Sequence, residues 1–147
     1  MRKIPEFKVE IKREISPTPR GAPGGIRRGQ DDGMRALFKK NLPEFHWVPV
    51  ETWALNAGVP DVEFCAPNGV SGWIEFKCYG KKGQIPALKP SQIGWIDRRI
   101  RVKGRVFIGV KKGEKLFLAP GERARDFLDA LMGPLSWAEI REHLRTR

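Results

Sequence analysis

Apolar residues follow two kinds of spacing along the chain, and each kind predicts its own secondary structure. Alternation with polar residues, or a short β-branched run, predicts strands, whereas recurrence every three or four positions predicts helices. Strands are expected at residues 46–53, 61–66, 72–79, 105–110 and 116–118, and helices at residues 34–42, 90–103, 124–131 and 137–144. The order α-β-β-β-α-β-β-α-α predicts an α/β (α+β) fold in which helices flank a mixed β-sheet.

The first thirty residues lack this regularity and are expected to form an extended basic arm in front of one domain, residues 31–147. Within the arm, alternation at residues 7–11 predicts a short strand. Residues 16–33 then hold three prolines and five glycines, a composition that disfavours both helix and strand. Asp31 or Asp32 is the expected N-cap of the first helix.

The chain is strongly basic. Its 147 residues include 28 Lys and Arg against 17 Asp and Glu, which gives a formal net charge of +11. A domain this basic usually binds a polyanion, most often nucleic acid. The sequence has no long apolar stretch, its N-terminus is charged, and its two cysteines favour free thiols in a reducing compartment. We therefore expect a cytoplasmic protein with no membrane partner.

Two opposite charges stand in the middle of an apolar strand. Glu75 and Lys77 are separated by Phe76 and follow Trp73 and Ile74, so both are expected near the core. They share one face of the strand, because strand side chains alternate. Burial of these charges without a purpose would cost several kcal/mol. The pattern therefore indicates a functional site.

Asp61 is expected to join this site through a β-hairpin. The turn at Asn68-Gly69 predicts that the strand starting near Asp61 pairs antiparallel with the strand carrying Glu75. If paired residue numbers add up to an even value near 138, Asp61 faces Lys77 and lies diagonally from Glu75, with Cα atoms about 7–8 Å apart. Two carboxylates at that spacing repel each other, and a bound divalent cation usually offsets this repulsion.

This arrangement resembles the PD-(D/E)xK nuclease superfamily, above all its small phage-type members, the VRR-NUC-like and Holliday-junction-resolvase-like nucleases. Pro60-Asp61 matches the first signature, Glu75-Phe76-Lys77 the second, and Gln92 a helix glutamine of the family. The resemblance covers somewhat under half of the chain and excludes the arm and the last two helices. It implies a restriction-endonuclease-like core.

The resemblance also implies a mechanism. Asp61 and Glu75, with the backbone carbonyl of Phe76, would bind Mg²⁺ or Mn²⁺, and the ion would polarise the scissile phosphate. Lys77 would orient the attacking water, and the products would be a 5′-phosphate and a 3′-hydroxyl. The acid that many relatives carry on the first helix has no clear match here, so the number of metals stays open.

Other interpretations of these residues remain. Glu51 is either an additional acid of the site or a solvated strand end, and Gln92 is either a site residue or a surface residue at a helix start. For Asp61, Glu75 and Lys77, the alternative is an ion-paired trio that only stabilises the structure.

Basic residues outside this cluster are expected to contact phosphates, which gives affinity without sequence information. Each of them alone could be a solvated surface charge, but their number favours a phosphate track. The expected nucleic-acid-binding residues are Arg27, Arg28, Lys81, Lys82, Arg98, Arg101 and Arg105.

We therefore expect a Mg²⁺-dependent DNA endonuclease, structure-selective or weakly sequence-selective, in phage-type recombination, replication or genome processing. RNA stays open as a substrate. The alternative is a catalytically silent nucleic-acid-binding or virion component that keeps the nuclease fold. The strand at residues 7–11, together with paired cutting by related resolvases, favours a homodimer. A phage-encoded chain would work in the host cytoplasm or associate with the virion.

Overall fold

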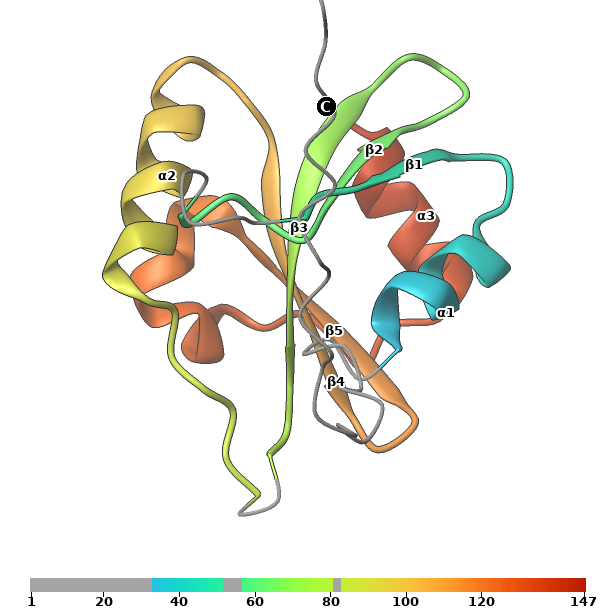
Figure 1. The fold of residues 1–147 in the computed structure, drawn as a ribbon. Helices are drawn as coiled ribbons and strands as arrows, with labels where there is room; N and C mark the ends of the chain where they lie inside the picture. The colour runs from blue at the N-terminus through green and yellow to red at the C-terminus, as the bar shows by residue number, and fades with distance from the viewer. Residues whose placement is uncertain (1–32, 52–56, 81–82) are drawn as a thin grey trace, which may run out of the picture.

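Five strands form one mixed β-sheet with the spatial order β1-β2-β3-β4-β5 in the computed structural model, which describes residues 33–51, 57–80 and 83–147 (Figure 1). The strands are β1 (His46–Pro49), β2 (Val62–Cys65), β3 (Ser71–Cys78), β4 (Val106–Lys112) and β5 (Lys115–Pro120). Only β3 and β4 pair in parallel; the other neighbours are antiparallel. All five predicted strands are found, although β1 is shorter than predicted.

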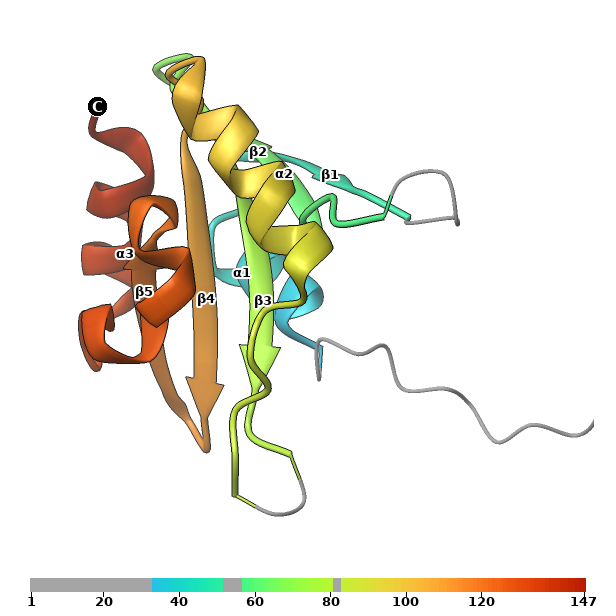
Figure 2. The same ribbon diagram turned by 90° about the vertical axis from the view of Figure 1, so that its left-hand side faces the viewer.

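Helices cover both faces of this sheet, which confirms the predicted mixed α and β architecture (Figures 1 and 2). The helices α1 (Met34–Asn41) and α3 (Trp137–Arg145) pack on one face, and α2 (Pro90–Arg101) and the 3-10 helix η2 (Gly121–Ala130) pack on the other. The alternation of β3 divides the core accordingly: Ile74 and Phe76 face α1 and α3, whereas Trp73 faces α2. None of the helices among the described residues is both long and apolar enough to cross a membrane.

The prediction of an α-helix at residues 124–131 is wrong about the kind of helix. The segment forms η2, and non-helical backbone angles at Arg123 and Asp126 interrupt it. Its buried residues, Gly121, Ala124 and Phe127, recur every three positions. That spacing matches the three residues per turn of a 3-10 helix rather than the 3.6 of an α-helix.

The first helix also begins differently from the prediction. Its N-cap is Gly33, whose backbone is left-handed (φ 76°), and no side chain caps the helix. Glycine adopts this conformation at little cost, and it occupies the N-cap position that the sequence analysis assigns to Asp31 or Asp32. Several predicted features lie outside the described residues: Asp31, Asp32, the arm at residues 1–30 with Arg27 and Arg28, and the loop residues Lys81 and Lys82.

The hairpin of β2 and β3 has the predicted antiparallel pairing and even parity. Val62 pairs with Ile74 and Cys65 with Ser71, so paired numbers add up to 136, two less than the sum of 138 that would set Asp61 opposite Lys77. Regular pairing therefore ends one position before Asp61 would lie opposite Glu75. Because the shift is an even number of residues, each side chain keeps its predicted face.

Candidate active site on strand β3

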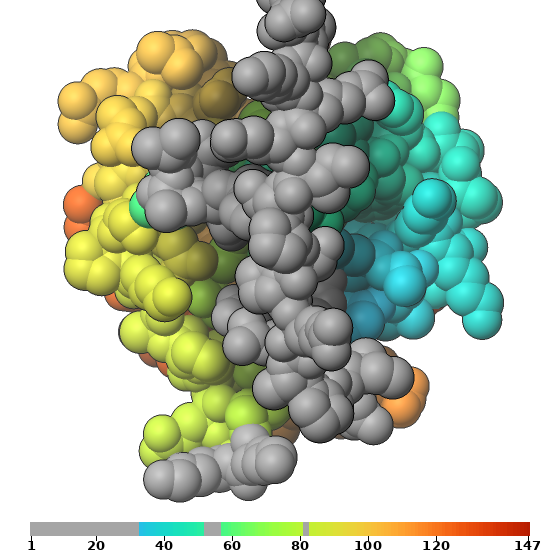
Figure 3. Space-filling view, in the orientation of Figure 1, coloured from blue at the N-terminus to red at the C-terminus, as the bar shows by residue number. Residues whose placement is uncertain are grey.

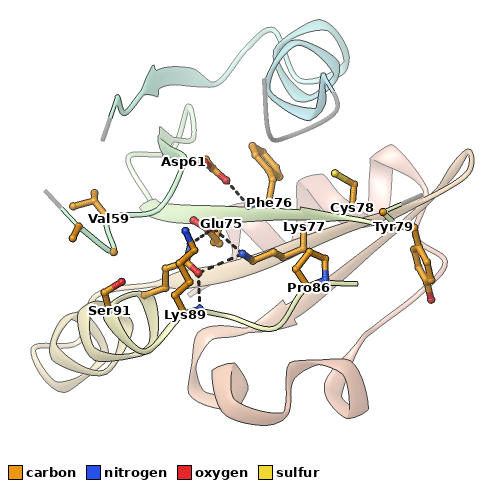
Figure 4. Close-up of a pocket in the computed structure, with 14 residues that line it drawn as sticks. Val59, Asp61, Glu75, Phe76, Lys77, Cys78, Tyr79, Pro86, Lys89 and Ser91 are labelled. Carbon is orange, nitrogen blue, oxygen red and sulfur yellow. Dashed lines mark hydrogen bonds and ion pairs between the residues drawn. The ribbon is translucent and has the colours of Figure 1, made fainter. Parts of the chain in front are cut away.

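A pocket of about 670 Å³ opens where three segments meet: the loop before β2, the second half of β3 and the first turn of α2 (Figure 4). Its lining includes Asp61, Glu75, Phe76, Lys77 and Gln92. Figure 4 shows the Glu75 and Lys77 side chains on β3 near the start of α2, with Asp61 close to the β3 backbone. The fold thus brings together the two signatures and the predicted helix glutamine.

Glu75 is buried, with only 4% of its surface exposed, and it is the one buried charged residue in the described part of the chain. One of its oxygens, Oε1, accepts a hydrogen bond from Gln92 Nε2 at 2.5 Å and lies 3.5 Å from Lys77 Nζ. The other oxygen, Oε2, has no hydrogen-bond partner within the described residues. One side of this carboxylate is therefore fixed by neighbours, and the other can take a ligand.

Gln92 connects the site to α2. It is the third residue of the helix, and its Oε1 accepts hydrogen bonds from the backbone N–H of Lys89 at 2.9 Å and from Lys77 Nζ at 3.3 Å. The same side chain donates to Glu75. Gln92 is therefore both a capping residue and a neighbour of the two charged groups, which joins the two roles that the sequence left as alternatives.

Asp61 reaches β3 beyond the end of the regular hairpin. Its Oδ2 accepts a hydrogen bond from the backbone N–H of Phe76 at 2.8 Å, and its Oδ1 lies 3.5 Å from the guanidinium of Arg35 on α1. Arg35 is not among the site residues that the sequence predicts. Its only signal was its place in α1 directly after buried Met34, which does not reveal a partner on another element.

The pKa of Glu75 is raised from 4.5 to about 7, chiefly because burial disfavours its charged form and then because the Asp61 carboxylate repels it. The Lys77 ammonium, together with hydrogen bonds from Lys77 and Gln92, opposes this rise without cancelling it. An acid with such a pKa is costly to ionise at neutral pH unless a further cation approaches. The shift is thus what a site poised to bind a cation would have.

A Glu75→Gln variant should be more stable than the wild type at high pH in metal-free buffer. Since the folded pKa exceeds the unfolded value of 4.5, wild-type stability falls as pH rises from about 4.5 to 7 and stays lower above it. The raised pKa corresponds to a loss of about 3 kcal/mol from the wild-type free energy of unfolding at pH 8 and to almost no loss at pH 4. Urea unfolding with EDTA at both pH values measures the difference. A difference that is the same at both pH values would show that ionisation of Glu75 costs nothing.

The donor set fits a hard divalent cation. Carboxylate and carbonyl oxygens are the ligands that Mg²⁺ and Mn²⁺ prefer, and one oxygen of Glu75 has no hydrogen-bond partner among the residues that the structure describes. The β2 pairing ends at Val62, opposite Ile74, so β2 does not pair with Phe76, and the Phe76 carbonyl points to the same side as its N–H, toward Asp61. The described residues hold no group of three or more His, Cys, Asp or Glu suited to a metal. Two carboxylates, this carbonyl and water would therefore form the ligand set.

The remaining predicted residues that the structure describes are not part of the lining of this pocket. Glu51 is exposed after β1 and is not part of the pocket lining in the described residues. Arg98 and Arg101 are exposed on α2, as phosphate-binding residues require. Their roles, and that of Glu51, stay predictions.

Arg105 has an unexpected structural role. Its guanidinium donates hydrogen bonds to the carbonyls of His143, Leu144 and Thr146, at 2.6 to 2.8 Å. These acceptors lie at the end of α3, where helix carbonyls lack partners of their own. A phosphate would have to compete for this side chain with three existing bonds. Both cysteines are free, as predicted.

No family model matches the sequence, and the comparison with curated proteins finds no match.

Proposed function

We propose that this chain is a metal-dependent DNA endonuclease with a PD-(D/E)xK-type site on a restriction-endonuclease-like core. The observation that carries the proposal is the buried Glu75, held by Lys77 and Gln92 beside Asp61 in an open pocket. A trio that only stabilised the fold would not require a pocket of about 670 Å³ around its charges. The net charge of +11 supports a polyanionic substrate.

In this proposal Asp61, Glu75 and the Phe76 carbonyl hold Mg²⁺ or Mn²⁺. When bound, the ion supplies charge stabilisation at the scissile phosphate and lowers the pKa of a bound water. Arg35 and the Phe76 N–H orient Asp61, while Gln92 orients both Glu75 and Lys77.

Lys77 supplies the cationic group of the reaction. Its ammonium is largely buried, with 11% of the side chain exposed, and has three donors, of which Glu75 and Gln92 engage at most two. A remaining N–H can donate to the attacking water or to a phosphate oxygen. Such a donor in a partly desolvated site stabilises developing negative charge more strongly than it would in water.

A cleavage panel tests the proposed function. Linear, nicked, flapped and four-way DNA, with matched RNA, are incubated with the full chain in Mg²⁺, in Mn²⁺ and in EDTA. We expect cleavage only with metal, products with 5′-phosphate ends, and a preference among the structures. If no substrate is cut in either metal while binding is tight and salt-sensitive, the chain is a silent nucleic-acid-binding component instead.

A further inference from the structure

A second pocket, of about 550 Å³, lies at the other end of α2. It is formed where β3 begins, around Ser71 to Trp73, and where α2 runs into β4, around Lys103 and Gly104. Four cationic side chains and two acidic ones line it: Arg99, Lys103, Arg105 and Arg147, with Glu63 and Glu122. The pocket therefore carries an excess of positive charge.

The guanidinium of Arg99 is held in this second pocket by two aromatic rings. Its guanidinium carbon lies 5.2 Å from the ring centroid of Trp73 and 4.7 Å from that of Trp95. Its aliphatic stem covers Gly104, where an added Cβ would lie 2.4 Å from Arg99 Cδ. The two indoles and the bare glycine backbone thus fix the direction of the side chain.

The N–H donors of this fixed guanidinium have no acceptor among the described residues. No hydrogen bond or ion pair joins the Arg99 guanidinium to another group in the described ranges, although the residue is partly buried. Aromatic faces attract the charge of a guanidinium but leave its in-plane N–H groups available. A planar cation that is held in place and lacks an acceptor is suited to an oxyanion ligand, which it can bind through two parallel hydrogen bonds.

Lys103 adds a second cation under backbone strain. Its φ is +66°, the left-handed region that usually carries glycine directly after a helix. It is the only residue other than glycine with positive φ in the described part of the chain. Glycine there would be less strained, so the lysine side chain is kept at some cost in stability, as is typical of functional positions.

Both pockets border α2 and the same face of β3. Glu75, Lys77 and Trp73 share that face, and Gln92 and Arg99 lie at opposite ends of α2, about 10 Å apart along its axis. A nucleic-acid strand that runs alongside α2 can therefore place one phosphate in each pocket. Figure 3 shows α2 (yellow) and the α1–β1 region (blue to cyan) on opposite sides of this view of the molecule.

We propose that Arg99 and Lys103 bind a second backbone phosphate of the nucleic-acid strand whose scissile phosphate occupies the active-site pocket. The identity of the ligand rests on the proposed function. The site would fix the position of the strand relative to Glu75 without reading bases, since a phosphate carries no sequence information. It differs from the predicted track in using Arg99, which faces the pocket, instead of the exposed Arg98 and Arg101.

Binding of a fluorescein-labelled DNA oligonucleotide in EDTA, followed by anisotropy over a range of NaCl concentrations, tests this site without any cleavage. Arg99→Met keeps the packing volume and should weaken binding about tenfold. It should also reduce the slope of log K against log[salt] by about one. Lys103→Gly should reduce the slope similarly and suits the left-handed backbone. Lys40→Met, which removes an exposed charge from α1 on the opposite face, is the matched control.

If both Arg99→Met and Lys103→Gly bind like Lys40→Met, the phosphate site is wrong. Should Arg99→Met disturb the two tryptophans, which near-ultraviolet circular dichroism would reveal, Lys103→Gly decides the outcome. Loss of affinity in the two variants of a chain that cuts no substrate would overturn the proposed nuclease function and still support the phosphate site. Cleavage by the wild type together with unchanged binding in both variants would support the nuclease function and overturn the phosphate site.

Discussion

Replacement of Lys77 by methionine is expected to slow DNA cleavage by about 10²–10⁴-fold, while affinity for DNA falls by no more than about tenfold. The variant loses the ammonium that lies 3.5 Å from Glu75 and 3.3 Å from Gln92. It therefore loses the donor that we assign to the attacking water or the phosphate. Methionine keeps a similar length, so the β3 backbone and its pairing with β4 should persist.

The same substitution has a consequence for pH dependence. Lys77 lowers the pKa of Glu75, so its removal should raise that pKa above about 7. The residual cleavage of Lys77→Met should then need a higher pH than cleavage by the wild type, because Glu75 must ionise to hold the metal. Single-turnover rates across a pH series measure this shift, with Lys40→Met as the control. A Lys77→Met enzyme with the rate and pH profile of the wild type would exclude the proposed role of this residue.

A Gly58→Ala substitution should destabilise the protein by roughly 2–5 kcal/mol and disturb the active site. Gly58 has a φ of +89°, and an added Cβ would lie 2.2 Å from the carbonyl oxygen of Ser91 in the first turn of α2. The obstructing atom is backbone and cannot rotate away. The loop that carries Asp61 would have to move away from α2, and with it from Gln92.

Gly69 provides a matched control for this prediction. Its φ of +84° is nearly the same, yet no atom lies within 4 Å of an added Cβ. Gly69→Ala should therefore cost only the left-handed backbone strain, about 1–2 kcal/mol. Urea unfolding of both variants separates the strain from the steric contact. Equal losses of stability would mean that the contact between the loop and α2 contributes nothing.

Local patterns in the sequence were sufficient to predict most of the fold. The alternation around Glu75 identified β3 and the face of each of its side chains, because a strand has a fixed period of two. The Ser-x-x-Glu pattern from Ser136 to Glu139 is the local signature of a capping box, and both of its hydrogen bonds form at the start of α3. The three-residue spacing in η2 is visible in the sequence as well, but an apolar stripe of this length also fits an α-helix.

The parts that the sequence could not predict depend on contacts between distant elements. Arg35 reaches Asp61 across 26 positions of the chain, and Arg105 reaches the end of α3 across about 40. No local period encodes such a pair. Arg99 likewise looks like its neighbours Arg98 and Arg101 in the sequence. Only the fold, which packs Trp73 and Gly104 against its side chain, distinguishes it from them.

The buried carboxylate on β3 is the centre of this account, and cleavage by a Glu75→Gln variant tests it most directly. Wild type, Glu75→Gln and the exposed control Glu142→Gln are purified in parallel, and their single-turnover cleavage of one DNA substrate is measured with Mg²⁺ and with EDTA. We predict cleavage by the wild type and the control in Mg²⁺ only, and a loss of at least about a thousandfold in Glu75→Gln, with DNA binding retained. Equal cleavage by Glu75→Gln and the wild type, or no cleavage by either, would contradict the account.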